Sequence, residues 1–378
     1  MICSTSCSNR FLLLPLALLV VLLLGGCAGL EHTTVSSSGN TDLPARLEEG
    51  ALYALLPIEN LSASRAPLAE LDMQLRNALK ERGIRLLEPE RLETFMREQR
   101  MRSRGGINLT QSRALRDLGV AGVFITALET WREGEVPRVS LIMRLVQSGD
   151  EPEILWIDGV GRTGDEAPGL LGLGLVKDVR QLTAGALERL LDSFVAARSG
   201  AEPGTAAQKK RHQPKYRYRA ADFDPAAEYR VAVIPFLNVD TREHAGRIVG
   251  LHVVRQLQRY GNLKVLEPGL VREALLSQRM IMQEGPSLEA AELLAAADVL
   301  GADLVVSGRV FAYEGDAGES KVDFSLQIFS GIEPQVIWTS HSYGGGDDGV
   351  YFFDRGRVPS AHELAGRLAE AAIGDFAQ

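Results

Sequence analysis

The chain contains little cysteine, with three residues among 378, and none follows Cys27. The sequence beyond that position therefore offers neither a disulfide nor a thiol nucleophile, and its stability must come from a buried core. The length and the 45% content of hydrophobic residues are sufficient for two or three globular domains, each with its own core.

The residue patterns of common catalytic sites are also missing. Six histidines are present, namely His32, His212, His244, His252, His341 and His362, and no two have the spacing of a helical metal-binding pair. Ser307-Gly308 lacks the glycines of a hydrolase nucleophile turn. The glycines in 169–174 are not followed by the lysine of a phosphate loop. His252 is interpreted as a packed helix residue, and we predict no enzymatic activity, no cofactor and no metal site.

Positive charge is not in excess, because the formal net charge is −8. Proteins dedicated to binding nucleic acids usually carry a basic face. We therefore expect no nucleic-acid partner.

The N-terminus has the features of an export signal. Arg10 precedes an apolar run, Phe11 to Leu24, which is short for a transmembrane helix but typical of a signal peptide. It ends in Leu24-Gly25-Gly26-Cys27, which resembles the lipobox of bacterial lipoproteins. This resemblance implies a signal peptide over residues 1–26 and a lipid on the Cys27 thiol. Ala28 points to an outer-membrane lipoprotein that faces the periplasm.

An internal duplication organises the rest of the chain. Leu86-Leu87-Glu88-Pro89 matches Val265-Leu266-Glu267-Pro268, 179 residues later. Residues 148–156 match 330–338, 182 residues later, and both segments end in tryptophan. We predict a lipidated tether over 27–47, one copy over 48–198, a basic linker rich in Pro and Gly over 199–225, and a second copy over 226–378.

Both copies have the same predicted order of elements. Short apolar runs at 51–58 and 230–237 predict a buried first strand, and leucines at three- and four-residue spacing predict an amphipathic helix that ends at Gly83 or Gly261. A short strand and two helices follow, the second capped by Asn108 or Ser287. Three strands and a closing helix complete each copy, at 121–129, 136–147, 153–162 and 176–197, and at 303–313, 320–330, 335–343 and 361–376. The fold class is α/β (α+β), with a mixed sheet in each copy.

The second copy resembles the curli secretion lipoprotein (CsgG-like) family. The similarity lies in the strand 231–238, which ends in Pro-Phe-Leu-Asn, in Val265-Leu266-Glu267, and in the segment 300–308, which begins Leu-Gly-Ala-Asp and ends in Gly. The first copy matches less well. The resemblance implies a mixed sheet covered by helices, a fold found both in secretion-pore subunits and in lipoproteins that activate peptidoglycan synthases.

Two segments are predicted to contact a partner or lipid. One is basic, with Lys209, Lys210, Arg211, Lys215, Arg217 and Arg219 interleaved with tyrosines. The other is apolar and includes Leu170, Leu171 and Leu173. Charged residues of this kind add to binding at an anionic surface, and exposed apolar segments favour docking. The alternative for the basic segment is a solvated linker, and the alternative for the apolar segment is a loop packed under the last helix.

These features favour a lipid-anchored envelope protein with a non-enzymatic binding or scaffolding role in envelope assembly or secretion. The membrane, through the lipid, and other envelope proteins are the expected partners, and an oligomer is compatible with the sequence. One alternative is a subunit or accessory ring of a curli-type secretion channel, although the connections between the long strands are short for membrane hairpins. Others are an activator of a peptidoglycan synthase and a hydrolase with an unrecognised site.

Overall fold

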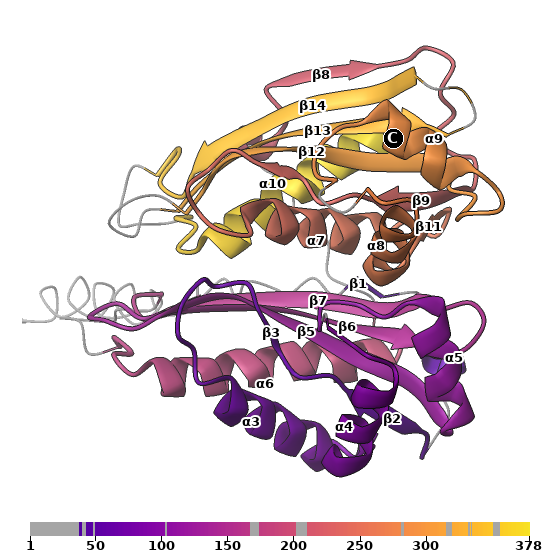
Figure 1. Cartoon of the computed structure of the whole chain (residues 1–378). Coiled ribbons are helices and arrows are strands. Elements are labelled where there is room, and N and C mark those ends of the chain that lie inside the picture. Colours follow the sequence, from indigo (N-terminus) through magenta and orange to yellow (C-terminus); the bar gives the residue numbers. More distant parts are fainter. Residues whose placement is uncertain are drawn as a thin grey trace, which may run out of the picture. The chain divides into compact units, whose positions relative to one another are not determined.

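Two mixed β-sheets with helices packed on them form the described part of the chain, which confirms the predicted α/β class (Figure 1). The structure is a computed structural model that describes residues 38–39, 43–47, 50–102, 104–166, 174–201, 210–280, 283–314, 320–331, 333, 335–350 and 356–378. Residues 35–378 belong to one compact unit. None of the helices in the described ranges combines the length and apolar character needed to cross a bilayer.

The first sheet has seven strands among the described residues. Their spatial order is β1 (Ser38–Gly39), β7 (Ile154–Thr163), β6 (Arg138–Gln147), β5 (Val120–Arg132), β2 (Leu52–Leu55) and β4 (Arg85–Leu86), with β3 (Glu59–Asn60) paired to β5. Strand β2 is parallel to β4 and β5, as expected for a crossover through a helix, whereas β5, β6 and β7 are antiparallel.

The second sheet repeats this order strand by strand. It runs β8 (Tyr216–Arg219), β14 (Gln335–Gly345), β13 (Lys321–Ser330), β12 (Leu304–Tyr313), β9 (Tyr229–Val233) and β11 (Leu263–Val265), with β10 (Leu237–Asn238) paired to β12. We call the two sheets sheet 1 and sheet 2. Strand β8 lies inside the segment predicted as a linker, so part of that segment completes the edge of sheet 2.

The helices follow the same repeat. Those of the first half are α2 (Leu43–Arg46), α3 (Leu68–Glu81), α4 (Pro89–Glu98), α5 (Leu109–Asp117) and α6 (Val179–Arg198). Those of the second half are α7 (Ala245–Leu257), α8 (Pro268–Ser277), α9 (Leu288–Ala295) and α10 (Ala361–Phe376). A 3₁₀ turn spans Lys210–His212.

Local sequence signals account for these helices. Leu71, Leu75 and Leu79 form the buried stripe of α3, and Gly83 follows its end with a left-handed φ of 78°. The side chain of Asn108 accepts from the N–H of Gln111 in a capping box at α5, and Ser287 accepts from Ala290 at α9, so both predicted caps are confirmed.

The hydrophobic core extends across both halves. Helices α3 and α6 pack on one face of sheet 1, and α7 and α10 pack on the corresponding face of sheet 2. Helix α10 also contacts β7, so α7 and α10 lie between the two sheets (Figure 1). One continuous cluster of buried residues includes Val123, Ile125 and Ile157 from sheet 1 and Leu364 from α10. The halves therefore share a core, in place of the two separate cores expected from the sequence.

A β-bulge recurs at the same place in both sheets. In β5, Leu128 pairs with Leu141 and Thr130 with Ser140, which leaves Glu129 as the extra residue. In β12, the register shifts between Val310 and Ala312, which makes Phe311 the extra residue. A bulge bends its strand and redirects a side chain, and both bulged residues lie in the regions described next.

Candidate functional site

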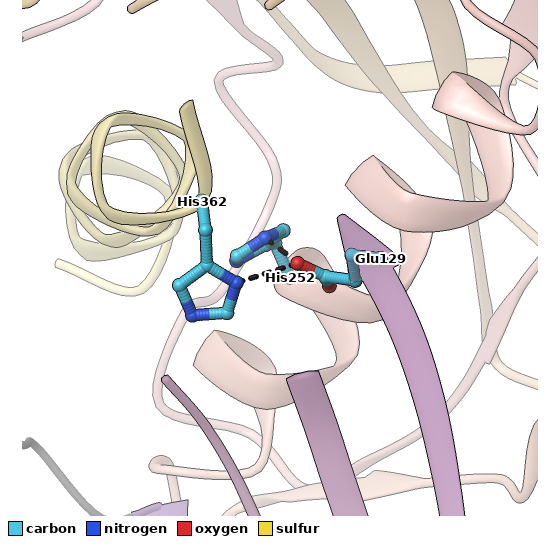
Figure 2. Close-up of side chains that lie close together, drawn as sticks. All are labelled: Glu129, His252 and His362. Atoms are coloured by element: carbon cyan, nitrogen blue, oxygen red, sulfur yellow. Dashed lines mark hydrogen bonds and ion pairs between the residues drawn. The ribbon is translucent and has the colours of Figure 1, made fainter. Parts of the chain in front are cut away.

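A buried cluster of three ionisable side chains lies where the two halves meet. Glu129 comes from β5 in sheet 1, His252 from α7 and His362 from the first turn of α10. Figure 2 shows both imidazole rings turned toward the carboxylate. None of the three side chains is more than 4% exposed. The sheet of one half and two helices of the other thus build one polar site inside the shared core.

The distances within this cluster are short. His362 Nδ1 lies 2.5 Å from Glu129 Oε2, and His252 Nε2 lies 3.5 Å from Glu129 Oε1. The two imidazole centroids are 4.6 Å apart in an edge-on arrangement. Because an ionised carboxylate only accepts, His362 Nδ1 is the donor of the short hydrogen bond.

Two glycines make room for His362. A Cβ atom added to Gly159 would lie 2.6 Å from His362 Cε1, and one added to Gly161 would lie 2.8 Å from His362 Cβ. Real Cβ atoms do not approach other atoms so closely, so side chains at these two positions of β7 would displace the start of α10. The glycines therefore permit the close docking of the second half on sheet 1.

Burial and charge act against each other in the cluster. Burial raises the pKa of Glu129, but His362 and His252 lower it by more, so the net pKa lies well below its usual range. Burial lowers the pKa of His252, and Glu129 offsets only part of that shift. The histidines thus favour the ionised form of Glu129, whereas burial disfavours a second proton on His252.

Further buried charge pairs join the halves. The guanidinium of Arg144 on β6 makes two hydrogen bonds to the carboxylate of Glu267, of 2.9 and 2.7 Å, and both residues are almost fully buried. Arg255 Nη2 on α7 lies 2.5 Å from Asp158 Oδ1 on β7, and Ser193 donates to the other oxygen of Asp158. Burial raises the pKa of Asp158, and the charge of Arg255 counteracts part of this effect. A junction with several such pairs is specific in geometry, because a shifted partner would leave a buried charge unpaired.

A cavity of about 370 Å³ opens at the end of β5, beside this junction. Ser62, Ala63, Ser64, Thr130, Trp131, Arg132, Thr241, Arg242, Glu243 and Glu314 line it. Arg242 donates to the backbone oxygens of Leu61 and Glu129 and pairs with Glu314 at 3.4 Å. None of the three cluster side chains lines this cavity, so the cluster is closed off from it.

The second notable region is the face of sheet 2 that points away from α7 and α10. It carries five aromatic side chains, Tyr216, Tyr218, Phe311, His341 and Tyr343, which we call the outer aromatic surface. Tyr216 is 69% exposed and Phe311 is 42% exposed. His341 is in the middle, with ring centroids of Tyr216, Phe311 and Tyr343 within 6.3 Å, and it is fixed by a 2.6 Å hydrogen bond to Asp323.

Several residues predicted from the sequence lie outside the described residues: Leu24, Gly25, Gly26, Cys27, Leu170, Leu171, Leu173 and Lys209. Lys210 lies in the 3₁₀ turn. Among the other basic residues, Arg211 donates to backbone oxygens of Asp348 and Gly356, and Arg217 and Arg219 bind Asp375. Lys215 lies over the ring of Tyr343, 5.6 Å from its centroid. The arginines thus tie the segment to the second half, whereas Tyr216 and Tyr218 face outward.

Sequence reasoning did not find the buried cluster. It interpreted His252 as a packed histidine, and the residue is indeed fully buried, but its partners come from distant parts of the chain. The one available signal was Glu129 itself, an acid at the end of an otherwise apolar strand. Phe311 and Tyr343 were likewise not singled out.

Comparison with known proteins gives no family. No family model matches the chain, and no curated protein matches it. Among solved structures, a PelC dodecamer subunit from Paraburkholderia phytofirmans is 15% identical with a TM-score of 0.30, covering 43% of this chain and 94% of that one. Lipoprotein GNA1162 from Neisseria meningitidis is 15% identical with a TM-score of 0.27, covering 38% and 99%. The C-terminal domain of LpoB from Escherichia coli is 13% identical with a TM-score of 0.24, covering 31% and 83%. Likenesses of this size carry no argument about function.

Proposed function

We propose that this protein is a non-enzymatic lipoprotein of the bacterial outer membrane, of the CsgG-like family, that binds another envelope protein from the periplasmic side. The lipobox ending in Cys27 supports the anchor and the compartment. The outer aromatic surface supports the binding role. The equivalent surface of sheet 1 holds the second half, whereas this surface of sheet 2 is uncovered.

The two faces correspond residue by residue. Trp156 and Trp338 are matched in the repeat, and each pairs with the equivalent strand neighbour, Leu145 or Ile328. Three residues further on, Gly159 in sheet 1 corresponds to His341 in sheet 2. Five residues further on, Gly161 corresponds to Tyr343. The part of this face that α10 covers in sheet 1, around Gly159 and Gly161, therefore carries aromatic and partly exposed side chains in sheet 2.

These differences exclude the docking of a second chain on sheet 2 in the way that the second half docks on sheet 1. The docking of α10 on sheet 1 requires Gly159 and Gly161, and the rings of His341 and Tyr343 fill the equivalent space on sheet 2. A second chain therefore does not repeat the internal contact there. Terminal units of repeated arrays often carry such a changed outer face.

The composition of the outer aromatic surface suits a protein partner. Tyrosine and phenylalanine are enriched in protein interfaces and supply large contact areas with few rotatable bonds, and they often dominate the binding energy. Asp323 and Lys215 place a charge of each sign beside the rings, which favours a partner with polar groups at the rim. The exposed aromatics come from three strands of a rigid sheet and need little ordering on binding.

Site-specific photocrosslinking in intact cells tests this function. A photoreactive amino acid is placed at Tyr343 or Tyr218 on the outer aromatic surface, and at Met73, which is 59% exposed on α3, as the matched control. We expect both surface positions to form the same discrete adduct with an envelope protein, and Met73 not to form it. The double change Phe311→Ser and His341→Ser should remove the adduct formed from Tyr218.

Three outcomes would go against the proposal. Identical adduct patterns at Met73 and Tyr343 would show that the surface has no special role. A folded, membrane-bound protein that forms no adduct from either surface position would refute the proposed binding surface. An adduct only with a second copy of the chain would replace the proposed partner by self-assembly.

A further inference from the structure

The buried cluster of Glu129, His252 and His362 has a property that the proposed function does not use. Its three side chains come from β5, α7 and α10, and one ligand atom from each lies within 4.8 Å of the other two. We propose that this cluster is a structural binding site for a divalent transition metal of the zinc class, which links the two halves of the molecule.

The donor set fits this class of metal. Two imidazole nitrogens and one carboxylate oxygen are common ligands of zinc, and imidazole also suits cobalt, nickel and copper. Zinc bonds of about 2.0–2.1 Å in a tetrahedron place neighbouring ligand atoms about 3.3–3.4 Å apart. His252 Nε2 and Glu129 Oε1 are already 3.5 Å apart. His362 Nδ1 and Glu129 Oε2, at 2.5 Å, need to separate slightly.

The cluster also contains polar atoms that are not satisfied without a ligand. Nδ1 of His252 and Nε2 of His362 are buried and have no hydrogen-bond partner, and Nε2 of His252 and Oε1 of Glu129 have only each other, 3.5 Å apart. Buried polar atoms in proteins are nearly always paired, because burial without a partner is costly. A metal ion between His252 Nε2 and Glu129 Oε1 would satisfy two of these atoms at once.

The charges of the cluster are compatible with a dication. The imidazole nitrogens and the carboxylate oxygens of the cluster all offer lone pairs to a cation, and Glu129 supplies a negative charge when ionised. A metal bound at His362 Nδ1 takes the place of the proton on that nitrogen, and the proton moves to Nε2 of the same neutral ring. Asp158 on β7, which β6 separates from β5, adds a second buried carboxylate near His362. Tyr313, whose buried hydroxyl has no partner, also lies within the field of Glu129.

The position of the cluster indicates a structural rather than a catalytic metal. The side chains are buried, and none of them lines the cavity at the end of β5. Structural zinc sites are closed, whereas catalytic ones keep a coordination position open to substrate. Because the ligands come from both halves, the metal would oppose their separation.

Metal binding by the intact protein tests this inference. The full lipidated chain is purified in detergent, stripped with a chelator and dialysed, and then titrated with Co²⁺ and Zn²⁺. We expect one equivalent per chain, a visible Co²⁺ absorption band of tetrahedral type that Zn²⁺ abolishes, and a rise in melting temperature with Zn²⁺.

Matched variants assign the site. Glu129→Gln and His252→Gln should each lower the affinity at least about tenfold and remove the cobalt band. His341→Gln is the control, because His341 is also hydrogen-bonded to an acid but lies outside the cluster. This variant should leave the metal affinity and the cobalt band unchanged. Circular dichroism of each metal-free variant checks its folding.

Two results would overturn the inference. One is a folded wild-type chain that retains less than about a tenth of an equivalent of either metal after dialysis. The other is an unchanged cobalt band in a folded Glu129→Gln or His252→Gln protein. If one variant fails to fold, the wild-type stoichiometry and the other variant still decide the question.

Discussion

Glu129 and Phe311 occupy the same bulged position of equivalent strands, yet one is wholly buried and the other is 42% exposed. In sheet 1, the bulge directs a carboxylate onto two histidines of the second half. In sheet 2, it presents a ring beside His341 at the surface. A single duplicated backbone feature therefore buries a carboxylate in the internal junction of one copy and exposes an aromatic ring on the surface of the other.

The pair of Arg144 and Glu267 should contribute strongly to the integrity of the junction. Arg144→Met leaves the Glu267 carboxylate buried without its partner, and we expect a loss of about 3–5 kcal/mol in the free energy of unfolding. Urea denaturation followed by circular dichroism measures it. Adding Glu267→Gln, which removes the charge but keeps an acceptor for the Gly269 N–H, should recover most of the loss.

The exposed pair of Arg113 and Asp150 provides the control for this measurement. Arg113→Met should change the free energy of unfolding far less, because solvent screens surface pairs. Equal losses for Arg113→Met and Arg144→Met would contradict the role assigned to the buried pair.

Glycine at position 159 should be required for close docking of α10. Gly159→Ala places a methyl group against His362 and Ile142, and overpacking of this kind costs about 1–3 kcal/mol. Gly250→Ala on α7 is the matched control, because its added Cβ meets no atom within 4 Å, and alanine favours the helix by up to about 1 kcal/mol. Melting temperatures of the two variants should therefore move in opposite directions, and a parallel shift would argue against the docking geometry.

The stability of the metal-free protein should decrease in mild acid. Folding lowers the pKa of His252 below its ordinary value of 6.5, so the unfolded chain binds more protons as the pH falls through that value. His252 faces Glu129, His362 and Arg255, and the depressed pKa of Glu129 adds a further loss below about pH 4.5. Asp158 acts in the opposite sense, because burial raises its pKa.

Denaturation with chelator present at several pH values between about 7.5 and 5.5 measures this dependence. We expect the free energy of unfolding to fall with pH in the wild type and to fall less steeply in His252→Gln. Identical slopes in the two proteins would mean that His252 takes up no proton on unfolding.

Attachment to the membrane should depend on one thiol. Cys27→Ser removes the thiol at which the lipobox resemblance predicts lipid attachment, and we expect the protein to leave the membrane fraction while the fold of the described residues is retained. Fractionation followed by immunoblotting measures the distribution, with Cys7→Ser as the control. A Cys27→Ser protein that stays bound to membranes as before would refute the proposed anchor.

Much of the fold could be predicted because its signals are local. Strands β6 and β7 begin and end within two residues of their predicted positions, and the caps at Asn108 and Ser287 are where the sequence places them. Because the chain contains two copies, the type of each element is predicted twice from different residues, which makes the assignment less ambiguous. Strand β8 was not predicted because all four of its residues are exposed. The segment therefore lacks the buried apolar positions that indicate a strand and resembles a linker.

The buried cluster could not be predicted for a different reason. Glu129, His252 and His362 meet only after the second half has docked on sheet 1, and no sequence spacing records that arrangement. The bulge that holds Glu129 depends on the pairing register of β5 with β6, which is a property of two strands together. The sequence shows that Gly159 in the first copy corresponds to His341 in the second. It does not show that position 159 lies on the face of sheet 1 that contacts α10.

The shared core has a consequence for how the chain is made. During synthesis, the first half emerges before the second, and its sheet then exposes Ile157 and the face around Gly159 until α10 arrives. An exposed apolar face of this kind favours aggregation of incomplete chains. Sheet 1 is therefore protected only once the second half has been made and has docked, so chains that end within the second half should aggregate more readily than the complete protein.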